Sequence, residues 1–316
     1  MKTKVCIVGL GYWGSILVQK FDNLKNVELT VCDKDQDKIL KIIKTYQDIK
    51  TFSNYKAVLN SDVDAVVLAV NPLSTHYTMA KQALQHKKDV WLEKPMTATS
   101  KEAEELISLA KENKVLLHVD HTFEYSPHVQ YIKKVLDSGE LGNILYVSMD
   151  RLNLGLYQQD YNVIWDLCPH DFSILNYWFG EPYEITPIMR CSSFGMADIS
   201  ELHISYDDFF ADIRVSWRHP EKVRKTIIIG TKKTLIYDDV GANKIMIHDI
   251  KVDYNYGDYK YKNKKNILAE YYDEWEPIQL EAKHFVTCVD KRQPTLTPGE
   301  SGLKVMRLLE NANKEC

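Results

Sequence analysis

The chain has 316 residues, of which 45% are hydrophobic and 27% charged, and its formal net charge is −4. This length allows two domains with substantial cores, and the slightly negative charge gives no basic field for nucleic acid or an anionic membrane. No apolar run reaches the ~18 residues that a membrane-spanning helix needs. The six cysteines form no C-x-x-C pair, which favours a reducing, cytoplasmic location over a disulfide framework.

A glycine-rich turn follows the first apolar segment, residues 5–8, which we expect to be a buried strand. Gly9, Gly11 and Gly14 fall at the G-x-G-x-x-G spacing, and helical character follows them. In a dinucleotide fold the first glycine permits a tight turn, the second lets a pyrophosphate approach the backbone, and the third lets the helix pack on the strand. The alternative is a purely structural strand, turn and helix that binds no ligand.

The acid that follows the next strand strengthens the dinucleotide interpretation. Residues 27–32 are apolar and end at Asp33, where such folds place the carboxylate that hydrogen-bonds the adenosine ribose. A carboxylate there would repel the 2′-phosphate of NADP, so we expect NAD as the cofactor and NADP as the less favoured one. Tyr12 and Trp13 lie inside the loop and are expected cofactor contacts.

Strands and helices alternate with short connections as far as residue 122. We expect helices at 36–46 and 100–113 and strands near 50–52, 65–70, 90–92 and 115–119. This rhythm is typical of a doubly wound parallel sheet. The sequence therefore predicts an α/β protein whose NAD(P)-binding Rossmann domain covers residues 1–122.

The rhythm changes after residue 122. Helices are expected at 127–137 and 169–179, and strands at 143–151, 202–206, 212–217, 225–230, 234–237 and 244–248. Apolar and polar residues alternate in several of these strands, as in a sheet with one covered face. We predict an α+β domain with a large open, mainly antiparallel sheet over residues 123–298, and a C-terminal helix in residues 299–316 that packs back on the Rossmann domain.

A stretch rich in tyrosine and lysine, residues 253–276, allows two interpretations. Tyrosines two residues apart on a strand could stack nucleic-acid bases. The alternative is an exposed edge hairpin or a subunit contact with solvated lysines, and the acidic balance of the whole chain favours it. We therefore expect no nucleic-acid partner.

Two segments whose residues could take part in binding or catalysis follow predicted parallel strands. Asn71-Pro72 comes after residues 65–70, and Glu93-Lys94-Pro95 comes after residues 90–92. Ligands bind at the carboxyl ends of strands in open α/β sheets, so the Lys94 ammonium is a candidate functional group. A lysine at such a position is otherwise simply solvated.

Asp166 and His170 are four residues apart, which places them on one face if the segment is helical. Pro169 is accepted in a first helical turn, so we expect a helix to begin there. A carboxylate that orients an imidazole beside an ammonium is a workable proton-transfer set, and the alternative is a capping Asp with a surface His. A metal site formed by Asp166, Cys168 and His170 is disfavoured, because residues two apart on a helix lie on opposite faces. The sequence also offers no second group of metal ligands, so we expect no metal.

On these motifs the chain resembles the Gfo/Idh/MocA oxidoreductase family along nearly its whole length. The matching motifs are the glycine-rich turn at 9–14, Asn71-Pro72 with His76, Glu93-Lys94-Pro95, and Asp166-x-x-x-His170. The resemblance implies hydride transfer at a sugar or polyol carbon, with Lys94 and His170 as the catalytic pair and Asp166 contacting substrate. It also implies cofactor contacts from Asn71, Pro72, His76, Glu93 and Lys94, and a homo-oligomer, dimer or tetramer, formed through the open sheet.

Two residues depart from the family pattern, since Asn71 stands where Thr is frequent and Cys168 where a small residue is frequent. Neither departure removes a catalytic group. The segment from Trp165 to Asp171 is most similar to members that act on nucleotide-linked sugars, such as the 3-dehydrogenases of UDP-N-acetylhexosamines. Tyr125, Asn162 and Trp165 flank the matched motifs, so we expect them, with Lys94, Asp166 and His170, to contact substrate.

The sequence thus predicts an NAD-dependent dehydrogenase that oxidises a secondary hydroxyl of a nucleotide-linked sugar. Two alternatives remain. The first is a dehydrogenase of free sugars or polyols of the inositol type, and the second is a catalytically silent dinucleotide-binding regulator.

Overall fold

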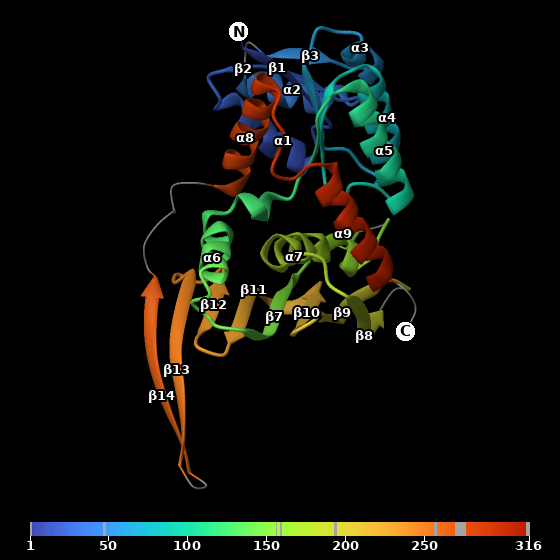
Figure 1. Cartoon of the computed structure of the whole chain (residues 1–316). Coiled ribbons are helices and arrows are strands. Elements are labelled where there is room, and N and C mark those ends of the chain that lie inside the picture. The colour runs from blue at the N-terminus through green and yellow to red at the C-terminus, as the bar shows by residue number, and fades with distance from the viewer. Residues whose placement is uncertain are drawn as a thin grey trace. The chain divides into compact units, whose positions relative to one another are not determined.

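The computed structural model describes residues 2–46, 49–155, 157–158, 160–192, 195–255, 258–268 and 276–313, without the side chains of 190 and 250–268. The chain divides into two units (Figure 1). Unit 1 comprises Met1–Tyr125 and Trp275–Arg307, and unit 2 comprises Ser126–Glu274 and Leu308–Cys316.

Unit 1 contains a six-stranded parallel sheet in the order β3-β2-β1-β4-β5-β6. Its strands are β1 (Thr3–Val8), β2 (Val27–Cys32), β3 (Lys50–Phe52), β4 (Ala65–Leu68), β5 (Asp89–Leu92) and β6 (Leu117–Val119). The helices between them are α1 (Tyr12–Asp22), α2 (Gln36–Thr45), α3 (Tyr55–Leu59), α4 (Ser74–Gln85) and α5 (Ser100–Asn113), and the 3₁₀ helix η1 (Thr122–Tyr125) follows β6. The predicted Rossmann sheet is confirmed.

The apolar runs of the sequence become the centre of this sheet. Every residue of β4 and β5 is buried, as expected for strands covered by helices on both faces. The strand order reverses between β1 and β4, which creates the switch point where open α/β sheets bind ligands. The carboxyl ends of all six strands meet at this edge, so side chains that follow the strands are brought together there.

A helix from the far end of the sequence completes unit 1. On α8 (Pro277–Lys291), the apolar residues Ile278, Ala282, Phe285, Val286 and Val289 join the core formed by β1, α1 and Trp91. The sequence-based boundary at residue 298 places this helix in the second domain, whereas its apolar face is buried in the Rossmann core. The first half of α9 (Gly299–Ala312) also packs in unit 1, where Gly302 lies close to Met96 and Val119.

Unit 2 is built on an eight-stranded mixed sheet in the order β14-β13-β12-β11-β7-β10-β9-β8. Its strands are β7 (Ile144–Leu154), β8 (Glu184–Ser192), β9 (Ala197–Ser205), β10 (Phe210–Ser216), β11 (Arg218–Gly230), β12 (Thr234–Asp238), β13 (Ile245–Asn255) and β14 (Asp258–Leu268). All pairs are antiparallel except β7 with β10, so the predicted mainly antiparallel sheet is confirmed.

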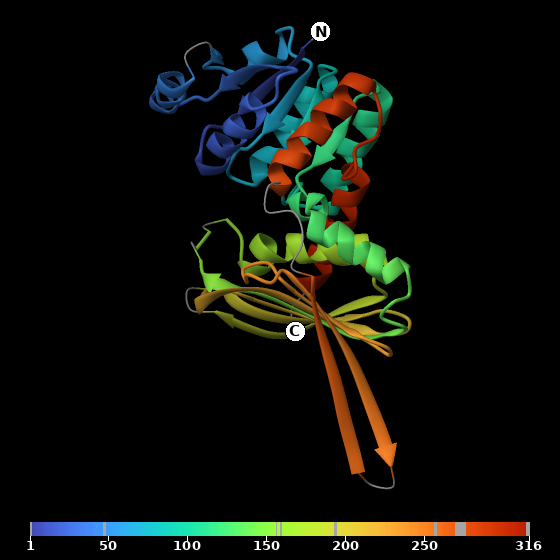
Figure 2. The ribbon, with the colours of Figure 1, turned by 90° about the vertical axis from the view of Figure 1, so that its left-hand side faces the viewer.

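Two helices, α6 (Pro127–Asp137) and α7 (Val163–Phe179), cover one face of this sheet (Figure 2). Buried and more exposed residues alternate along these strands, which explains why helices cover only one face of the sheet. The fully buried residues include Leu202 and Ile204 of β9 and Ile213 and Val215 of β10, and their neighbours in the chain are more exposed. Strand β8 was not predicted. Within the segment 253–276, where an edge hairpin was one interpretation, the end of β13 and the whole of β14 are present, and these two strands pair antiparallel. Residues 269–275 and the tyrosine and lysine side chains of the segment lie outside the described residues.

Helix α7 begins at Val163 and not at Pro169 as expected. Asn162 is the N-cap, and its side-chain oxygen accepts hydrogen bonds from the amides of Ile164 (3.1 Å) and Trp165 (3.2 Å). Pro169 therefore lies inside the helix and not in its first turn. The earlier start puts Asp166 in the first turn and leaves His170 on the same face one turn later.

Candidate active site

The glycine-rich turn between β1 and α1 shows why each glycine is needed. Gly9 has a φ of +92°, and a Cβ there would lie 2.2 Å from the Ala69 oxygen. A Cβ on Gly14 would lie 1.8 Å from the Gly9 oxygen, so this glycine permits close packing of helix on strand. A Cβ on Gly11 would meet no atom within 4 Å, and Gly11 offers no side-chain cap to α1. The free space and the uncapped helix N-terminus fit an anionic pyrophosphate.

Asp33 lies directly after β2, at the same edge as the glycine turn. One carboxylate oxygen accepts a hydrogen bond from the Leu10 amide at 2.7 Å, and the other accepts one from the Asp35 amide at 2.9 Å. Asp33 therefore braces the glycine turn, and each oxygen keeps acceptor capacity because a carboxylate oxygen has two lone pairs. This geometry fits the predicted contact with the adenosine ribose.

The segments after β4 and β5 are joined by a buried histidine. The ring nitrogens of His76 face the backbone oxygens of Pro95 (2.8 Å) and Val70 (2.9 Å). Burial lowers the pKa of His76. Both nitrogens face backbone oxygens, and a neutral ring donates its one N–H to one of them, so His76 helps to position the loop that carries Lys94, and its predicted contact with the cofactor stays a prediction. The Asn71-Pro72 and Lys94-Pro95 peptide bonds are both cis.

A buried acidic pair lies beside Lys94. Glu93 is 8% exposed, and burial raises its pKa well above the usual range, with Asp120 as the next cause. Asp120, directly after β6, accepts hydrogen bonds from the indole N–H of Trp13 (3.2 Å) and from the Thr122 hydroxyl. The predicted loop residue Trp13 thus ties the glycine turn to the end of β6, and Tyr12 beside it is exposed.

Sequence reasoning missed Asp120 and its neighbour His121. Both follow a predicted strand at the edge where ligands bind, so the strand prediction for residues 115–119 contained the signal that could have identified them. His121 is 1% exposed, and its pKa is lowered mainly by burial and to a lesser extent by the charge of Lys94.

Unit 2 presents Asp166 and His170 from α7, on one helical face as the spacing predicts. The indole N–H of the buried Trp217, at the junction of β10 and β11, donates a hydrogen bond to Asp166 Oδ2 at 2.9 Å. Sequence reasoning missed this residue, because 51 positions separate the two partners. Trp217 therefore fixes one carboxylate oxygen of Asp166.

A buried ion pair also anchors α7 to the sheet. Arg151 of β7 donates from Nε and Nη2 to the carboxylate of Asp171, with distances of 2.8–3.1 Å. Asp171 directly follows His170, so this bidentate pair fixes the helical turn that carries the imidazole. The neighbouring Cys168 is fully buried, and burial raises the pKa of its thiol.

Of the three residues expected to contact substrate by their proximity to the motifs, Tyr125 and Asn162 have structural partners for their side chains. The Tyr125 hydroxyl lies 3.3 Å from Thr297 Oγ1, and its ring is 4% exposed. Asn162 caps α7 and donates its side-chain N–H to Asn313 at 2.8 Å. Trp165 remains partly exposed in the first turn of α7. Lys94 belongs to unit 1 and His170 to unit 2, and their meeting at one substrate remains a prediction.

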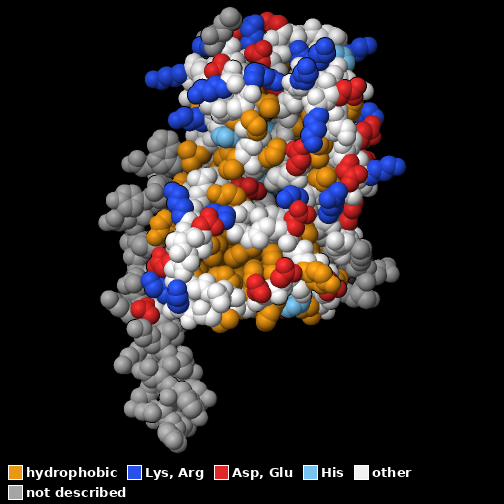
Figure 3. Space-filling model, in the orientation of Figure 1, with side chains coloured by type: hydrophobic (Ala, Val, Ile, Leu, Met, Phe, Trp, Pro, Cys, Tyr) orange, Lys and Arg blue, Asp and Glu red, His pale blue; other side chains and the backbone are white. Residues whose placement is uncertain are grey.

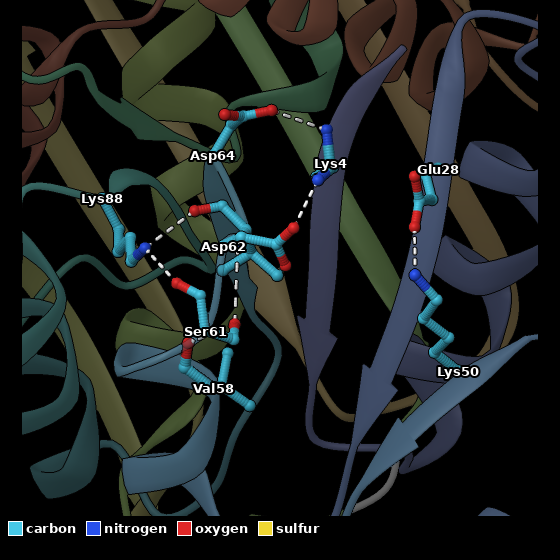
Figure 4. A network of polar contacts seen from close by, with 9 residues as sticks. Lys4, Glu28, Lys50, Val58, Ser61, Asp62, Asp64 and Lys88 are labelled. Carbon is cyan, nitrogen blue, oxygen red and sulfur yellow. Dashed lines mark hydrogen bonds and ion pairs between the residues drawn. The ribbon is translucent and has the colours of Figure 1, made fainter.

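A cavity of about 740 Å³ lies at the opposite, amino-terminal edge of the unit 1 sheet. Figure 4 shows polar groups of this edge: Lys4 pairs with Asp62, and Lys88 Nζ donates to the backbone oxygens of Ser61 (2.8 Å) and Val63 (2.9 Å). Cationic residues in the left-handed conformation, Lys87, Lys114 and Arg292, follow the carboxyl ends of α4, α5 and α8 there. Their charges complement those helix ends, so the cavity is explained without a ligand.

The remaining surface features add little to the site. Positive and negative side chains are interspersed over unit 1 on the face that Figure 3 draws. In the described ranges, no three His, Cys, Asp or Glu side chains are arranged to hold a metal ion. The helices within those ranges are also too short or too polar to cross a membrane.

Comparison with protein families decides the classification. Residues 3–121 match the NAD-binding Rossmann-fold model of an oxidoreductase family, and residues 129–236 match the GFO/IDH/MocA C-terminal domain. The chain belongs to the Gfo/Idh/MocA family. The predicted family and its NAD-binding fold are thereby confirmed.

Within this family the chain is similar to several characterised and uncharacterised proteins. It is 22% identical to the oxidoreductase YrbE of Bacillus subtilis, covering 98% of this chain and 92% of YrbE. It is 27% identical to the UDP-N-acetylglucosamine 3-dehydrogenase of Acidithiobacillus ferrooxidans over 61% of this chain and 60% of that protein. It is 24% identical to the NAD(+) scyllo-inositol 2-dehydrogenase of Bacillus subtilis over 74% and 70% of the two chains.

Solved structures of the family share the same fold. The Acidithiobacillus ferrooxidans enzyme superposes with a TM-score of 0.82 at 22% identity, covering 99% of this chain and 97% of that one. The dehydrogenase WlbA of Bordetella pertussis, solved with NADH and UDP-GlcNAcA, gives a TM-score of 0.82 at 18% identity, covering 99% and 95%. At these identities the likeness shows the fold alone.

Proposed function

We propose that this family member is an NAD-dependent dehydrogenase that oxidises a secondary hydroxyl of a nucleotide-linked sugar. The observation that carries the proposal is the pairing of Asp166 and His170 on one face of α7, in a chain whose Rossmann edge carries Lys94. The glycine turn and Asp33 would hold the dinucleotide, which, when bound, supplies the hydride acceptor.

The proposed chemistry assigns one task to each side chain. The imidazole of His170 accepts the hydroxyl proton while the carbinol C–H bond breaks and the carbonyl forms. The Lys94 ammonium stabilises the negative charge that develops on the oxygen. Asp166, oriented by Trp217, holds a substrate hydroxyl or the imidazole.

The choice of a nucleotide-linked substrate depends on two similarities. It is supported by the amino-acid sequence of residues 165–171 and by the similarity to UDP-N-acetylglucosamine 3-dehydrogenase. The similarity to scyllo-inositol 2-dehydrogenase favours free polyols as the second candidate. The third possibility is a regulator that binds NAD without turnover, and the presence of both Lys94 and His170 argues against it.

The test is a screen of the purified protein for NADH formation with UDP-sugars, free sugars and inositols. Activity with a UDP-N-acetylhexosamine is the expected result, and activity only with free polyols would replace the substrate class. NADH binding without any turnover would support the regulator. A higher kcat/KM with NADP than with NAD would refute the preference inferred from Asp33.

We also propose a homo-oligomer that forms through the sheet face of unit 2 that α6 and α7 leave uncovered. Phe210, which alternates with the buried Ala211, is 44% exposed on that face. Sedimentation or light scattering should give the mass of a dimer or tetramer, and a monomer at micromolar concentration would contradict the proposal. The proposed cytoplasmic setting is supported by the five described cysteines, which are free thiols.

A further inference from the structure

We propose that His121 is a ligand-binding residue of the active site and hydrogen-bonds a hydroxyl of the sugar or polyol substrate. This inference rests on the proposed function, because it names a further group at the same site. The argument starts from the position of the residue in the sheet.

His121 and Lys94 occupy equivalent positions on neighbouring strands. Leu92 of β5 pairs with Val119 of β6, and the Asp120 amide donates to the Leu92 oxygen at 2.9 Å. Lys94 and His121 each follow their strand two residues beyond the paired residues. Parallel strands in register bring such residues to the same edge, so the imidazole and the ammonium are neighbours.

The imidazole is buried without a hydrogen bond. His121 is 1% exposed, and among the described residues neither of its ring nitrogens has a partner. Its polar neighbours bond elsewhere, since Asp120 accepts from Trp13 and from Thr122. A buried polar atom without a partner costs roughly 1–3 kcal/mol, so a ligand that satisfies these nitrogens would remove a real penalty.

The histidine three residues earlier provides the contrast. His118 is also buried, but its Nε2 lies 3.0 Å from Glu281 Oε1 and its Nδ1 lies 3.3 Å from Thr297 Oγ1. Both ring nitrogens of His118, on β6, thus have polar partners, whereas those of His121, just beyond the strand at the ligand edge, have none among the described residues. Sites that keep such unsatisfied groups at a cost in stability are typically functional.

The topology assigns His121 to the substrate and not to the adenosine. In the strand order, Asp33 after β2 and the glycine turn after β1 mark the adenosine and pyrophosphate side of the switch point. β5 and β6 lie on the other side of it, and β6 is the last strand. A residue after β6 would therefore lie across the switch point from the residues that would hold the adenosine and pyrophosphate, on the side left for the substrate.

The chemistry of the ring favours a hydroxyl. Burial lowers the pKa of His121 to about 4, Asp120 raises it and Lys94 lowers it, so the ring is neutral at pH 7. A neutral imidazole offers one N–H donor and one nitrogen acceptor. A hydroxyl group can donate and accept, whereas a carboxylate or phosphate can only accept, and sugars and polyols are rich in hydroxyls.

The experiment compares His121→Phe with the matched variant His118→Phe. Removing an unsatisfied imidazole should leave the urea midpoint unchanged or higher, whereas His118→Phe should lower it because Glu281 and Thr297 lose a partner. For His121→Phe we expect an NADH Kd within about twofold of wild type and a KM for the sugar raised at least about tenfold. His121→Asn, which keeps a donor and an acceptor, should recover part of that loss.

Loss of stability in His121→Phe equal to that of His118→Phe would overturn the proposal, as would unchanged kinetics. A second readout separates it from the dehydrogenase proposal: the imidazole ¹⁵N signals of His121 in the NADH complex, with UDP-N-acetylglucosamine or scyllo-inositol added. Signals that shift without any turnover would uphold this inference and refute the dehydrogenase. Turnover with signals that do not move would refute the role of His121 and leave the dehydrogenase intact.

Discussion

Replacing Trp217 with Phe removes one hydrogen-bond donor from Asp166 and keeps an aromatic ring in its place. The indole N–H lies 2.9 Å from Asp166 Oδ2, and Trp217 is 2% exposed. Hydrogen bonds to charged groups contribute about 1.5–3 kcal/mol, and Asp166 is only half-buried, so we take the lower end. A loss of about 1.4 kcal/mol expressed in the transition state corresponds to a tenfold lower kcat/KM.

The matched control is Trp178→Phe. Trp178 is 3% exposed in the same unit and donates its indole N–H to the Val129 backbone oxygen at 3.0 Å, away from Asp166. Urea unfolding should show a similar loss of stability in the two variants, of about 1–2 kcal/mol. Only Trp217→Phe should lower kcat/KM.

A double-mutant cycle with Asp166→Asn decides whether the effect passes through the carboxylate. If Trp217 acts by fixing Asp166, the tryptophan substitution should cost much less in the Asp166→Asn background than in wild type. Equal losses in both backgrounds would refute the reasoning. So would a Trp178→Phe variant that loses as much kcat/KM as Trp217→Phe.

Three further predictions follow from packing and charge. Gly14→Ala, whose Cβ would lie 1.8 Å from a backbone oxygen, should lower the thermal midpoint, whereas Gly11→Ala, with open space around it, should keep the midpoint and weaken NAD binding in a fluorescence titration. Asp171→Asn should lower the free energy of unfolding by about 3–5 kcal/mol in urea titrations, because the buried Arg151 cation loses the carboxylate of its bidentate pair, and a loss below 1 kcal/mol would contradict the anchor. Burial raises the pKa of Glu124 from 4.5 to about 8, so its contribution to stability is complete below pH 4.5 and lost as the pH rises through 8. In urea titrations from pH 5 to 8, the free energy of unfolding should therefore fall less steeply with pH in Glu124→Gln than in wild type, by up to about 1.4 kcal/mol per pH unit. The same pH dependence in both proteins would refute the raised pKa of Glu124.

Sequence reasoning succeeded where one local signal determines the structure. The glycine spacing, the apolar strands and Asp33 each depend on near neighbours in the chain, and the Rossmann sheet follows from them. The i, i+4 relation of Asp166 and His170 also required only that the segment be helical. The start of α7 was placed too late because Pro169 was given the weight of a first-turn proline, although Asn162 carries the stronger capping signal.

The features that were missed depend on contacts between distant segments. The packing of α8 into the Rossmann core joins residues such as Phe285 and Trp91, and no period within α8 reveals that partner. The same holds for Trp217, which reaches Asp166 from another element. His121 was recognisable as a residue after a strand, but its lack of hydrogen-bond partners becomes visible only once its neighbours are placed.

The central claim is that Lys94 and His170 act on one substrate. The most direct test is the single-turnover rate of hydride transfer in Lys94→Ala and in His170→Ala, measured at saturating NAD with the substrate that the screen identifies. We predict that each variant transfers hydride at least about 100-fold more slowly, and that His170→Ala binds NADH with the wild-type Kd. Wild-type transfer rates in either variant would contradict the claim.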